Sequence, residues 1–197
     1  MTDRTRATGR RRTLDRAAIA TAARRVVEAD GIDALTLRRV AQELGTGQAS
    51  LYRHIADRAD LLAALFEDVL AEFPLVEPRG DPARAVERQW RALHDHLAER
   101  PWLVRLIADG AHAAEAAESV ADHGMGLLAD TGLTRADARR AYRALWHLLL
   151  GHLLNEHPFG HHLTSDSAAE DDTTAEPDFA WALRHLLAGI LAGRDGR

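Results

Sequence analysis

Three polar side chains in one short segment, Gln48, Ser50 and Tyr52, have the chemistry needed to bind a DNA duplex. A glutamine amide can donate to and accept from the major-groove edge of adenine at the same time. A serine hydroxyl can bind a base or a phosphate, and a tyrosine hydroxyl suits a phosphate oxygen. The segment therefore predicts a surface that contacts both the bases and the backbone of DNA.

Two predicted helices on either side of Gly45 would hold these side chains in place. The first helix begins after Thr36, whose hydroxyl can accept hydrogen bonds from the free N–H groups of the first turn. Gly45 suits the left-handed backbone with which such a helix ends. The apolar residues that share one face of this helix are Val40, Ala41 and Leu44.

A second helix of about two turns follows a turn through Thr46 and Gly47. We expect its apolar residues, Leu51 and Ile55, to face inward. The residues that remain outside are Gln48, Ala49, Ser50, Tyr52 and His54. An ordinary helical hairpin is the alternative interpretation, but the polar chemistry of the outer face favours a helix-turn-helix that reads the major groove.

The same stretch resembles a known protein family. The residues LTLRRVAQELG, followed by QASLYRHIADRADLL, are similar to the N-terminal domain of the TetR family of bacterial transcription regulators. The resemblance covers about residues 13–70 and depends on the Leu-Tyr-x-His step, its spacing from Leu44-Gly45 and the later Leu61-Leu62 pair. It includes a preceding helix with an apolar stripe formed by Ile19, Ala22, Ala23, Val26 and Val27.

The resemblance implies a role for each residue of the outer face. Base edges would be contacted by Gln48, Ala49 and Ser50, and the phosphate backbone by Thr36, Arg38, Tyr52, His54 and Arg58. The chain departs from the family pattern at Gly47, Ile55 and Arg58, where a serine-like cap, phenylalanine and lysine are usual. The last two changes keep the hydrophobicity and the charge, whereas Gly47 weakens the cap of the second helix.

Charge is distributed unevenly along the 197 residues. The formal net charge is -5, but residues 1–60 carry +4 and the remainder carries -9, so the basic part coincides with the predicted DNA reader. All 25 cationic side chains are arginine, a uniform bias that reflects GC-rich coding more than selection for DNA contacts. The absence of cysteine excludes disulfides, thiolate catalysis and cysteine-based zinc sites.

The hydropathy pattern favours a cytoplasmic protein. No apolar run is long enough to span a membrane. The arginine-rich start of the sequence lacks the hydrophobic segment of a signal peptide.

The chain is predicted to be all-α, with a small N-terminal part and a larger C-terminal part. Residues 1–12 form a basic arm that we expect to be disordered, residues 13–58 the three-helix DNA-binding domain, and residues 59–73 a connecting helix. The segment FPLVEPRGDP then breaks helicity, and Asp81 with Pro82 starts the next helix. Residues 81–193 form a helical ligand-binding and dimerisation domain, in which acidic composition predicts a mobile loop at 160–177.

The helix expected at 135–157 is apolar nearly all round in the stretch ALWHLLLGHLL, which favours burial on two sides. One face would enter its own core, and the other is small enough for close approach of a partner helix. The final helix, expected at 178–192, is also rich in leucine. We therefore predict a homodimer whose interface contains Ala144, Leu148, Gly151, Leu183, Leu187 and Ile190.

The resemblance implies that the C-terminal half senses a small molecule. An apolar or aromatic organic effector is expected, because all four tryptophans lie outside the DNA-reading segment. The candidate pocket residues are Trp90, His94, Trp102, His112, Met125 and Trp146. Ordinary core packing is the alternative interpretation for each of them.

Neither a metal site nor a cofactor nor a catalytic centre is expected. His147, His152 and His157 are spaced five apart, whereas metal-binding pairs on a helix are three or four apart. His157 and His161 are four apart, but Pro158 and Gly160 lie between them. Serine, histidine and aspartate occur without a glycine-bracketed nucleophile, a phosphate-binding loop or an HExxH motif.

These observations together predict a ligand-responsive repressor that binds a palindromic operator as a dimer. A ligand that prefers a dimer with wrongly spaced recognition helices would lower DNA affinity. A constitutive DNA-binding or architectural protein, which would need no cavity, is the first alternative. An enzyme acting on small molecules is the second, and it would show turnover.

Overall fold

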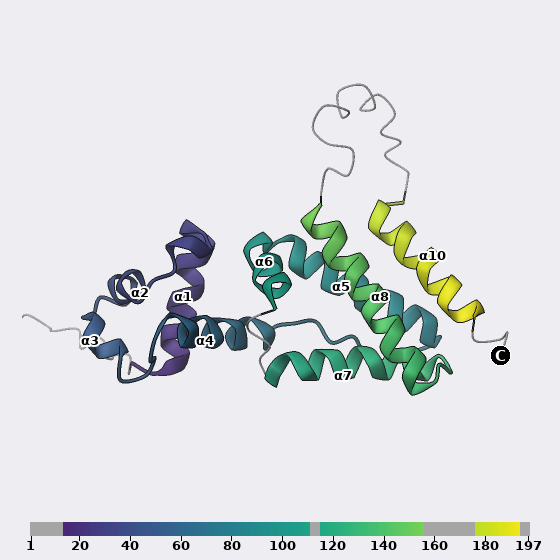
Figure 1. Cartoon of the computed structure of the whole chain (residues 1–197), viewed down its shortest axis with the longest axis horizontal. Helices are drawn as coiled ribbons and strands as arrows, with labels where there is room; N and C mark the ends of the chain where they lie inside the picture. The colour runs from purple at the N-terminus through teal and green to yellow at the C-terminus, as the bar shows by residue number, and fades with distance from the viewer. Residues whose placement is uncertain (1–13, 111–114, 156–175, 194–197) are drawn as a thin grey trace, which may run out of the picture. The chain divides into compact units, whose positions relative to one another are not determined.

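The computed structural model describes residues 14–110, 115–155 and 176–193, and in these ranges the regular structure is entirely helical (Figure 1). The chain divides into two compact units, Met1–Asp68 and Val69–Arg197. The fold is therefore all-α, as the sequence predicts. The expected N-terminal arm, His112 and nearly all of the expected loop at 160–177 lie outside the described residues.

The first unit is built on α1 (Arg16–Asp30), which is capped by Asp15, whose carboxylate accepts a hydrogen bond from the Ala18 N–H at 2.8 Å. A short 3₁₀ turn, η1 (Ile32–Ala34), leads to α2 (Leu37–Glu43) and α3 (Gln48–Leu51). The predicted apolar stripe of α1 is confirmed, because its members are 0–2% exposed: Ile19, Ala22, Ala23, Val26 and Val27.

Helix α2 has the two ends that the sequence predicts. The Thr36 hydroxyl accepts a hydrogen bond from the Arg39 N–H at 3.1 Å and caps the start. At the other end Gly45 has a φ of 63°, and its N–H donates to the Gln42 carbonyl at 3.0 Å. The Thr46 N–H donates to the Ala41 carbonyl at 3.0 Å, which completes a Schellman motif.

Helix α4 (Arg58–Leu70) is tied to the start of α1. The Asp57 carboxylate caps it by accepting from the Asp60 N–H at 2.9 Å, and Asp60 in turn accepts from the Ala56 N–H at 2.8 Å and from Arg16 at 2.6 Å. The helix ends at Leu70, three residues before the expected end of the connecting helix at 59–73, and the proline after Phe73 disfavours helical backbone at Phe73.

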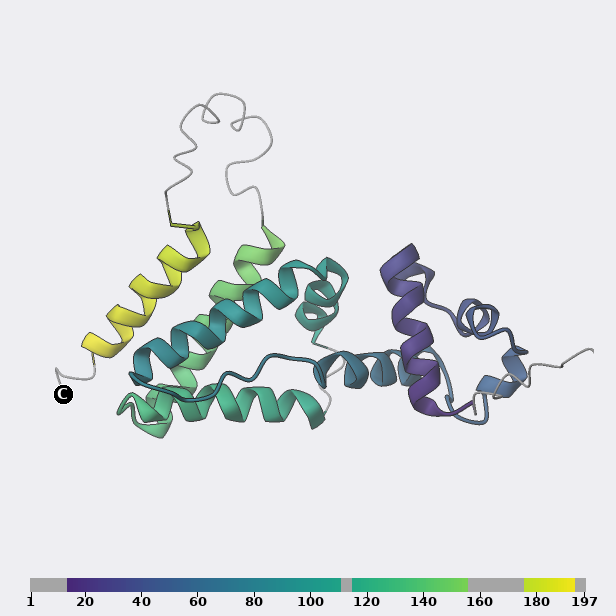
Figure 2. The same ribbon diagram turned by 180° about the vertical axis from the view of Figure 1, so that it is seen from behind.

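The second unit is a bundle around α8 (Arg135–Leu154), which packs against α5 (Pro82–Ala98), α6 (Pro101–Asp109), α7 (Glu115–Asp130) and α10 (Asp178–Ala192) (Figures 1 and 2). The start predicted at Asp81 is confirmed, with its carboxylate accepting from the Arg84 N–H at 2.9 Å. Helix α8 is capped in the same way by Thr134, whose hydroxyl accepts from the Asp137 N–H at 3.1 Å.

An extended segment after α4 runs along this bundle and is held by a buried glutamine (Figure 2). The Gln89 amide nitrogen donates to the Pro74 carbonyl and its oxygen accepts from the Val76 N–H, both at 2.7 Å. A ring nitrogen of His123 lies 3.1 Å from the Val76 carbonyl. Gln89, only 1% exposed, therefore uses both ends of its amide to fasten the segment to α5.

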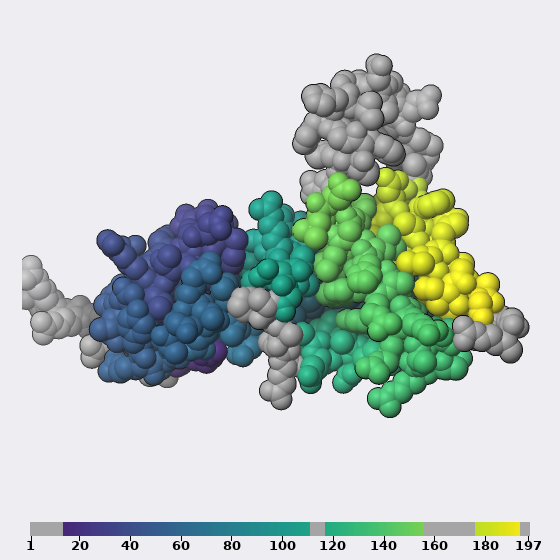
Figure 3. Space-filling view, viewed as in Figure 1, coloured from purple at the N-terminus to yellow at the C-terminus, as the bar shows by residue number. Residues whose placement is uncertain are grey.

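The adjoining helices α8 and α10 correct one part of the sequence interpretation (Figure 3). Leu183 and Leu187 of α10 are only 0% and 5% exposed, so their side chains fill the core of their own chain and are not available to a partner as expected. They are buried because α10 turns this leucine face toward α5 and α8. Ala144 and Leu148 of α8 are half-buried, and Gly151 is exposed.

No helix in the described ranges is long and apolar enough to cross a membrane.

Candidate nucleic-acid interface and effector unit

The recognition segment presents a polar outer face over an apolar inner one. Leu51 and Ile55 are 0% and 1% exposed, as predicted. The predicted outer residues Gln48, Ala49, Tyr52 and His54 are exposed, and Ser50 is half-buried.

The α-helix of this segment covers only Gln48–Leu51, one turn where about two were predicted. Beyond it the chain continues in tight turns, since the N–H groups of His54 and Ile55 both donate to the Leu51 carbonyl, at 2.8 and 2.9 Å.

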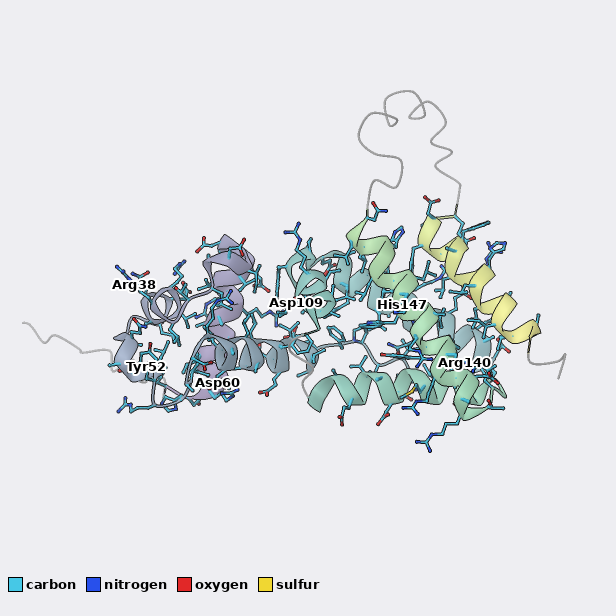
Figure 4. All side chains as sticks on the ribbon, viewed as in Figure 1. Arg38, Tyr52, Asp60, Asp109, Arg140 and His147 are labelled. Carbon is cyan, nitrogen blue, oxygen red and sulfur yellow. The ribbon has the colours of Figure 1, made fainter. Side chains whose placement is uncertain are left out.

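Gln48 and Tyr52 are joined to each other across one turn. The glutamine amide nitrogen donates to the tyrosine hydroxyl oxygen at 3.2 Å. The second amide hydrogen and the amide oxygen are not used by this bond, so Gln48 can still pair with an adenine edge through both. Figure 4 shows Tyr52 on this segment and Arg38 pointing outward from α2. The bond orders both side chains before DNA arrives, which reduces the entropy lost on binding.

Gly47 begins the recognition helix without a side-chain cap, as its residue type predicts. Its φ is -78°, and a Cβ built there meets nothing within 4 Å. The backbone would accept a serine at this position without strain.

Carboxylates neutralise several arginines of this unit. Arg25 and Glu43 are 3.0 Å apart, and Arg39 lies 2.9 Å from Asp30. The hydrogen bond from Arg25, helped by its charge, holds the pKa of the Glu43 carboxyl below its usual value. These pairs fasten α1 to α2, and their arginines are correspondingly less available to a phosphate.

The residues expected to bind the DNA backbone differ in whether their polar groups already form hydrogen bonds within the protein. Arg38 and Arg58 are both exposed, but the Nε of Arg58 donates to the Leu35 carbonyl at 3.2 Å and so also holds the chain that enters α2. The Thr36 oxygen accepts the capping bond from Arg39, which leaves the hydroxyl hydrogen to donate to a phosphate.

A surface hollow of about 790 Å³, which the sequence interpretation did not foresee, lies beside the recognition segment. Its walls come from α1, from the end of α2 and from the recognition segment, and they include Ala18, Arg25, Leu44, Ser50, Arg53 and His54. Arg53 was not among the predicted contacts, because no apolar period or capping pattern marks an exposed residue inside a turn.

In the second unit, an aromatic stack joins two of the predicted effector residues. Trp90 is fully buried and meets Tyr142 edge-on with ring centroids 5.7 Å apart, while Trp146 lies parallel to Tyr142 at 6.0 Å. Burial raises the pKa of Tyr142 to about 12. Within the described ranges, the indole N–H of Trp90 is buried and has no hydrogen-bond partner. Such a donor costs free energy unless an acceptor satisfies it.

The other residues predicted to bind the effector lie at separate places in the second unit. His94 lies against Phe179 with ring centroids 4.3 Å apart and is 5.2 Å from the His152 ring. Met125 lines a shallow hollow between α7 and α8, and Trp102 is half-buried on α6. In the described part of the chain, no three or more His, Cys, Asp or Glu residues gather as metal ligands.

The sequence of the helix-turn-helix matches a family model described as bacterial regulatory proteins, tetR family, over residues 19–65. Residues 19–65 therefore form a DNA-binding domain of the TetR family. The matched residues include the capped α2, the Gly45 turn and the whole recognition segment.

Proteins similar to this chain over a longer stretch include named repressors. Tetracycline repressor protein class D of Escherichia coli is 27% identical over 164 residues, which cover 81% of this chain and 74% of that protein. The HTH-type transcriptional repressor DrrR1 of Streptomyces coeruleorubidus is 34% identical over 102 residues, 48% of this chain. The match spans only 35% of the length of DrrR1.

Solved structures show that the likeness extends over the second unit. The apo structure of ActR from Streptomyces coelicolor superposes with a TM-score of 0.76 at 29% identity and covers 92% of this chain and 97% of ActR. ActR in complex with actinorhodin gives a TM-score of 0.75 at 29% identity, over 94% of this chain and 100% of ActR.

Proposed function

We propose that this protein is a DNA-binding transcriptional repressor, not an enzyme, that acts in the bacterial cytoplasm and responds to a small organic effector. The observation that carries the proposal is the exposed Gln48–Tyr52 pair on the recognition segment of a family-matched helix-turn-helix. The relatives named as repressors support the sign of regulation.

On DNA, the recognition segment enters the major groove. Gln48, Ala49 and Ser50 contact base edges, and Tyr52 with His54 contacts the backbone. Three further backbone contacts come from the entry to α2 and the start of α4: Thr36, Arg38 and Arg58.

The protein acts as a homodimer on a two-fold operator. Two large apolar side chains stay exposed on the helices concerned, Leu154 of α8 at 50% and Trp181 of α10 at 54%. A Cβ at Gly151 meets nothing within 4 Å, so a partner helix can approach α8 closely there. The interface proposed here keeps Ala144, Leu148, Gly151 and Ile190 and replaces the buried leucines of α10 by Trp181.

The effector is an aromatic or apolar molecule that carries a hydrogen-bond acceptor. It binds near Trp90 and Trp146, where its acceptor satisfies the buried indole N–H. The ActR complex with actinorhodin supports this class of ligand. Binding favours a dimer conformation that holds DNA weakly, so ligand and operator weaken each other by the same factor.

The experiment begins with selection of bound duplexes from a random pool by the purified protein. The recovered operator is then titrated with protein at several concentrations of a candidate aromatic effector, while tryptophan fluorescence reports effector binding. We expect a palindromic motif, saturable quenching, and equal factors for the mutual loss of affinity. Recovery of no motif would refute the repressor assignment, and an operator affinity that no tested effector changes would refute the coupling.

A constitutive DNA-binding protein is the second candidate, and the packing at Gly124 favours it. A Cβ there would lie 2.9 Å from Tyr142 and 3.0 Å from Trp90, so the aromatic stack is tightly enclosed on the α7 side. This alternative predicts an operator affinity that no compound changes and fluorescence that no compound quenches at saturation.

A further inference from the structure

We propose that Arg53 binds a DNA phosphate beside the recognition segment, with Ser50 and His54 as its neighbours on the wall of the hollow. The inference rests on the proposed DNA-binding function and adds a contact that the family resemblance did not supply. Three observations support it: Arg53 has no carboxylate partner, it lies on the same face as Ser50 and His54, and the charge of the nearby Glu43 carboxylate is compensated by other arginines.

The arginines of the first unit fall into two groups. Between residues 14 and 68, four of the seven arginines pair with carboxylates: Arg16 with Asp60, Arg24 with Glu28, Arg25 with Glu43 and Arg39 with Asp30. Within the described residues, Arg38, Arg53 and Arg58 have no ion pair to a carboxylate, and Arg58 is hydrogen-bonded to the Leu35 carbonyl. Arg38 and Arg53 are thus the two cations with neither an ion pair nor a hydrogen bond in the described unit.

Arg53 lies on a distinct face of the recognition segment. Ser50, Arg53 and His54 are related by three and four positions, so the helical turn that ends at Ile55 places them on one side. All three line the same hollow. Gln48 and Tyr52, joined by their hydrogen bond, occupy the neighbouring side. Gln48 is suited to a base edge, whereas Arg53 and His54 are suited to the sugar–phosphate chain that borders the groove, and the Ser50 hydroxyl can bind either.

The hollow is positively charged and partly apolar, which suits the sugar–phosphate backbone of DNA. Glu43, a carboxylate on its wall, is already bound by Arg25 and lies 3.4 Å from Arg39, so its negative charge is compensated within the protein. Arg53 then leaves a net positive charge on this wall. Leu14 and Ala18 on the α1 side offer apolar contact for a deoxyribose ring.

An exposed arginine without a partner is commonly only solvated, and salt dependence separates the two roles. Each lost phosphate contact lowers the slope of log affinity against log salt by about 0.9. A dimer loses two such contacts, so Arg53→Ala should flatten the slope by about 2. The ratio of wild-type to Arg53→Ala affinity should therefore be about tenfold smaller at 200 mM salt than at 50 mM salt.

The experiment compares the full-length wild type with three variants on the selected operator and on a scrambled duplex, from 50 to 200 mM salt. Arg53→Ala should weaken both duplexes by the same factor and flatten both slopes. Arg53→Lys should retain most of the slope, since the charge remains. The control Arg79→Ala removes the same charge from a side chain that is 83% exposed in the other unit, and its slope should match the wild type.

Each outcome has a definite meaning. A slope for Arg53→Ala equal to that of the wild type and of Arg79→Ala overturns the phosphate contact while leaving the DNA-binding function intact. A loss confined to one base position of the operator overturns it also, in favour of a base contact. Failure of the wild type to bind any duplex refutes the proposed function itself, and with it the inference.

Discussion

Replacing Gln89 by leucine removes both hydrogen bonds that fasten the segment after α4 to α5. The side chain is 1% exposed, and its two bonds, to the Pro74 carbonyl and to the Val76 N–H, are both 2.7 Å long. Leucine has a similar volume, so the change tests the hydrogen bonds and leaves the packing nearly unchanged.

The expected loss follows from the groups left without partners. One backbone donor and one backbone acceptor lose their bonds, at about 1–3 kcal/mol each, and the extra apolar surface of leucine returns about 1 kcal/mol. Val76 is half-buried, so water can reach part of its backbone. We expect the free energy of unfolding to fall by about 3 kcal/mol, and the melting temperature by about 6–12 °C for a chain of this size.

The assay follows tryptophan fluorescence during thermal and urea unfolding, because all four tryptophans lie in the second unit. Gln89→Glu is the matched control. Burial disfavours its ionised form, so the folded pKa of the new carboxyl lies above its unfolded value and the destabilisation grows as the pH rises from about 4. Near pH 4 the protonated carboxyl can donate to the Pro74 carbonyl, and this variant should approach the wild type while Gln89→Leu does not.

A loss below about 1 kcal/mol for Gln89→Leu would show that water replaces the two bonds and would refute the reasoning. Parallel pH profiles for the two variants would refute the donor role of the amide nitrogen.

Four further predictions concern separate parts of the protein. Gln48→Ala should cost about 1–3 kcal/mol of operator binding, at one base position only, and a repeated selection should show that position relaxed. Gly45→Ala should lower the stability of the first unit by about 1–2 kcal/mol because φ is positive there, whereas Gly47→Ser should raise it by about 0.5–1 kcal/mol by adding a helix cap. Chemical denaturation followed by circular dichroism measures both changes, and equal effects of the two variants would show that the positive φ of Gly45 does not matter. The hydrogen bond from the Ala56 N–H and then that from Arg16 hold the pKa of the Asp60 carboxyl below its ordinary value. The ionised carboxylate therefore stabilises the fold above about pH 4, and this stabilisation is lost as the pH falls through the folded pKa. Asp60→Asn should reduce the acid sensitivity of unfolding, and an unchanged pH profile would count against the pairing. Gly151→Arg should yield a monomer or an insoluble protein, and sedimentation of a monomeric wild type at micromolar concentration would contradict the proposed interface.

Much of the fold could be predicted because the signals for helices are local. The hydroxyl of Thr36 and the carboxylate of Asp81 cap their helices through bonds to residues three positions away, and Gly45 ends α2 through its own φ. The apolar stripe of α1 repeats with the helical period. The final helix also has the predicted bounds, 178–192.

The sequence by itself determined which segments are helical, where most helices begin and end, and which polar side chains of the recognition segment face outward, because these properties depend on neighbours within about one turn. Only the tertiary structure decided which arginines remain unpaired, since Arg16 meets Asp60 across 44 positions and Arg25 meets Glu43 across 18. Tertiary packing also decided the orientation of α10, whose leucine pattern suits either its own core or a partner. Helical periodicity identifies an apolar face but not the surface that covers it, because that depends on contacts between residues far apart in the chain.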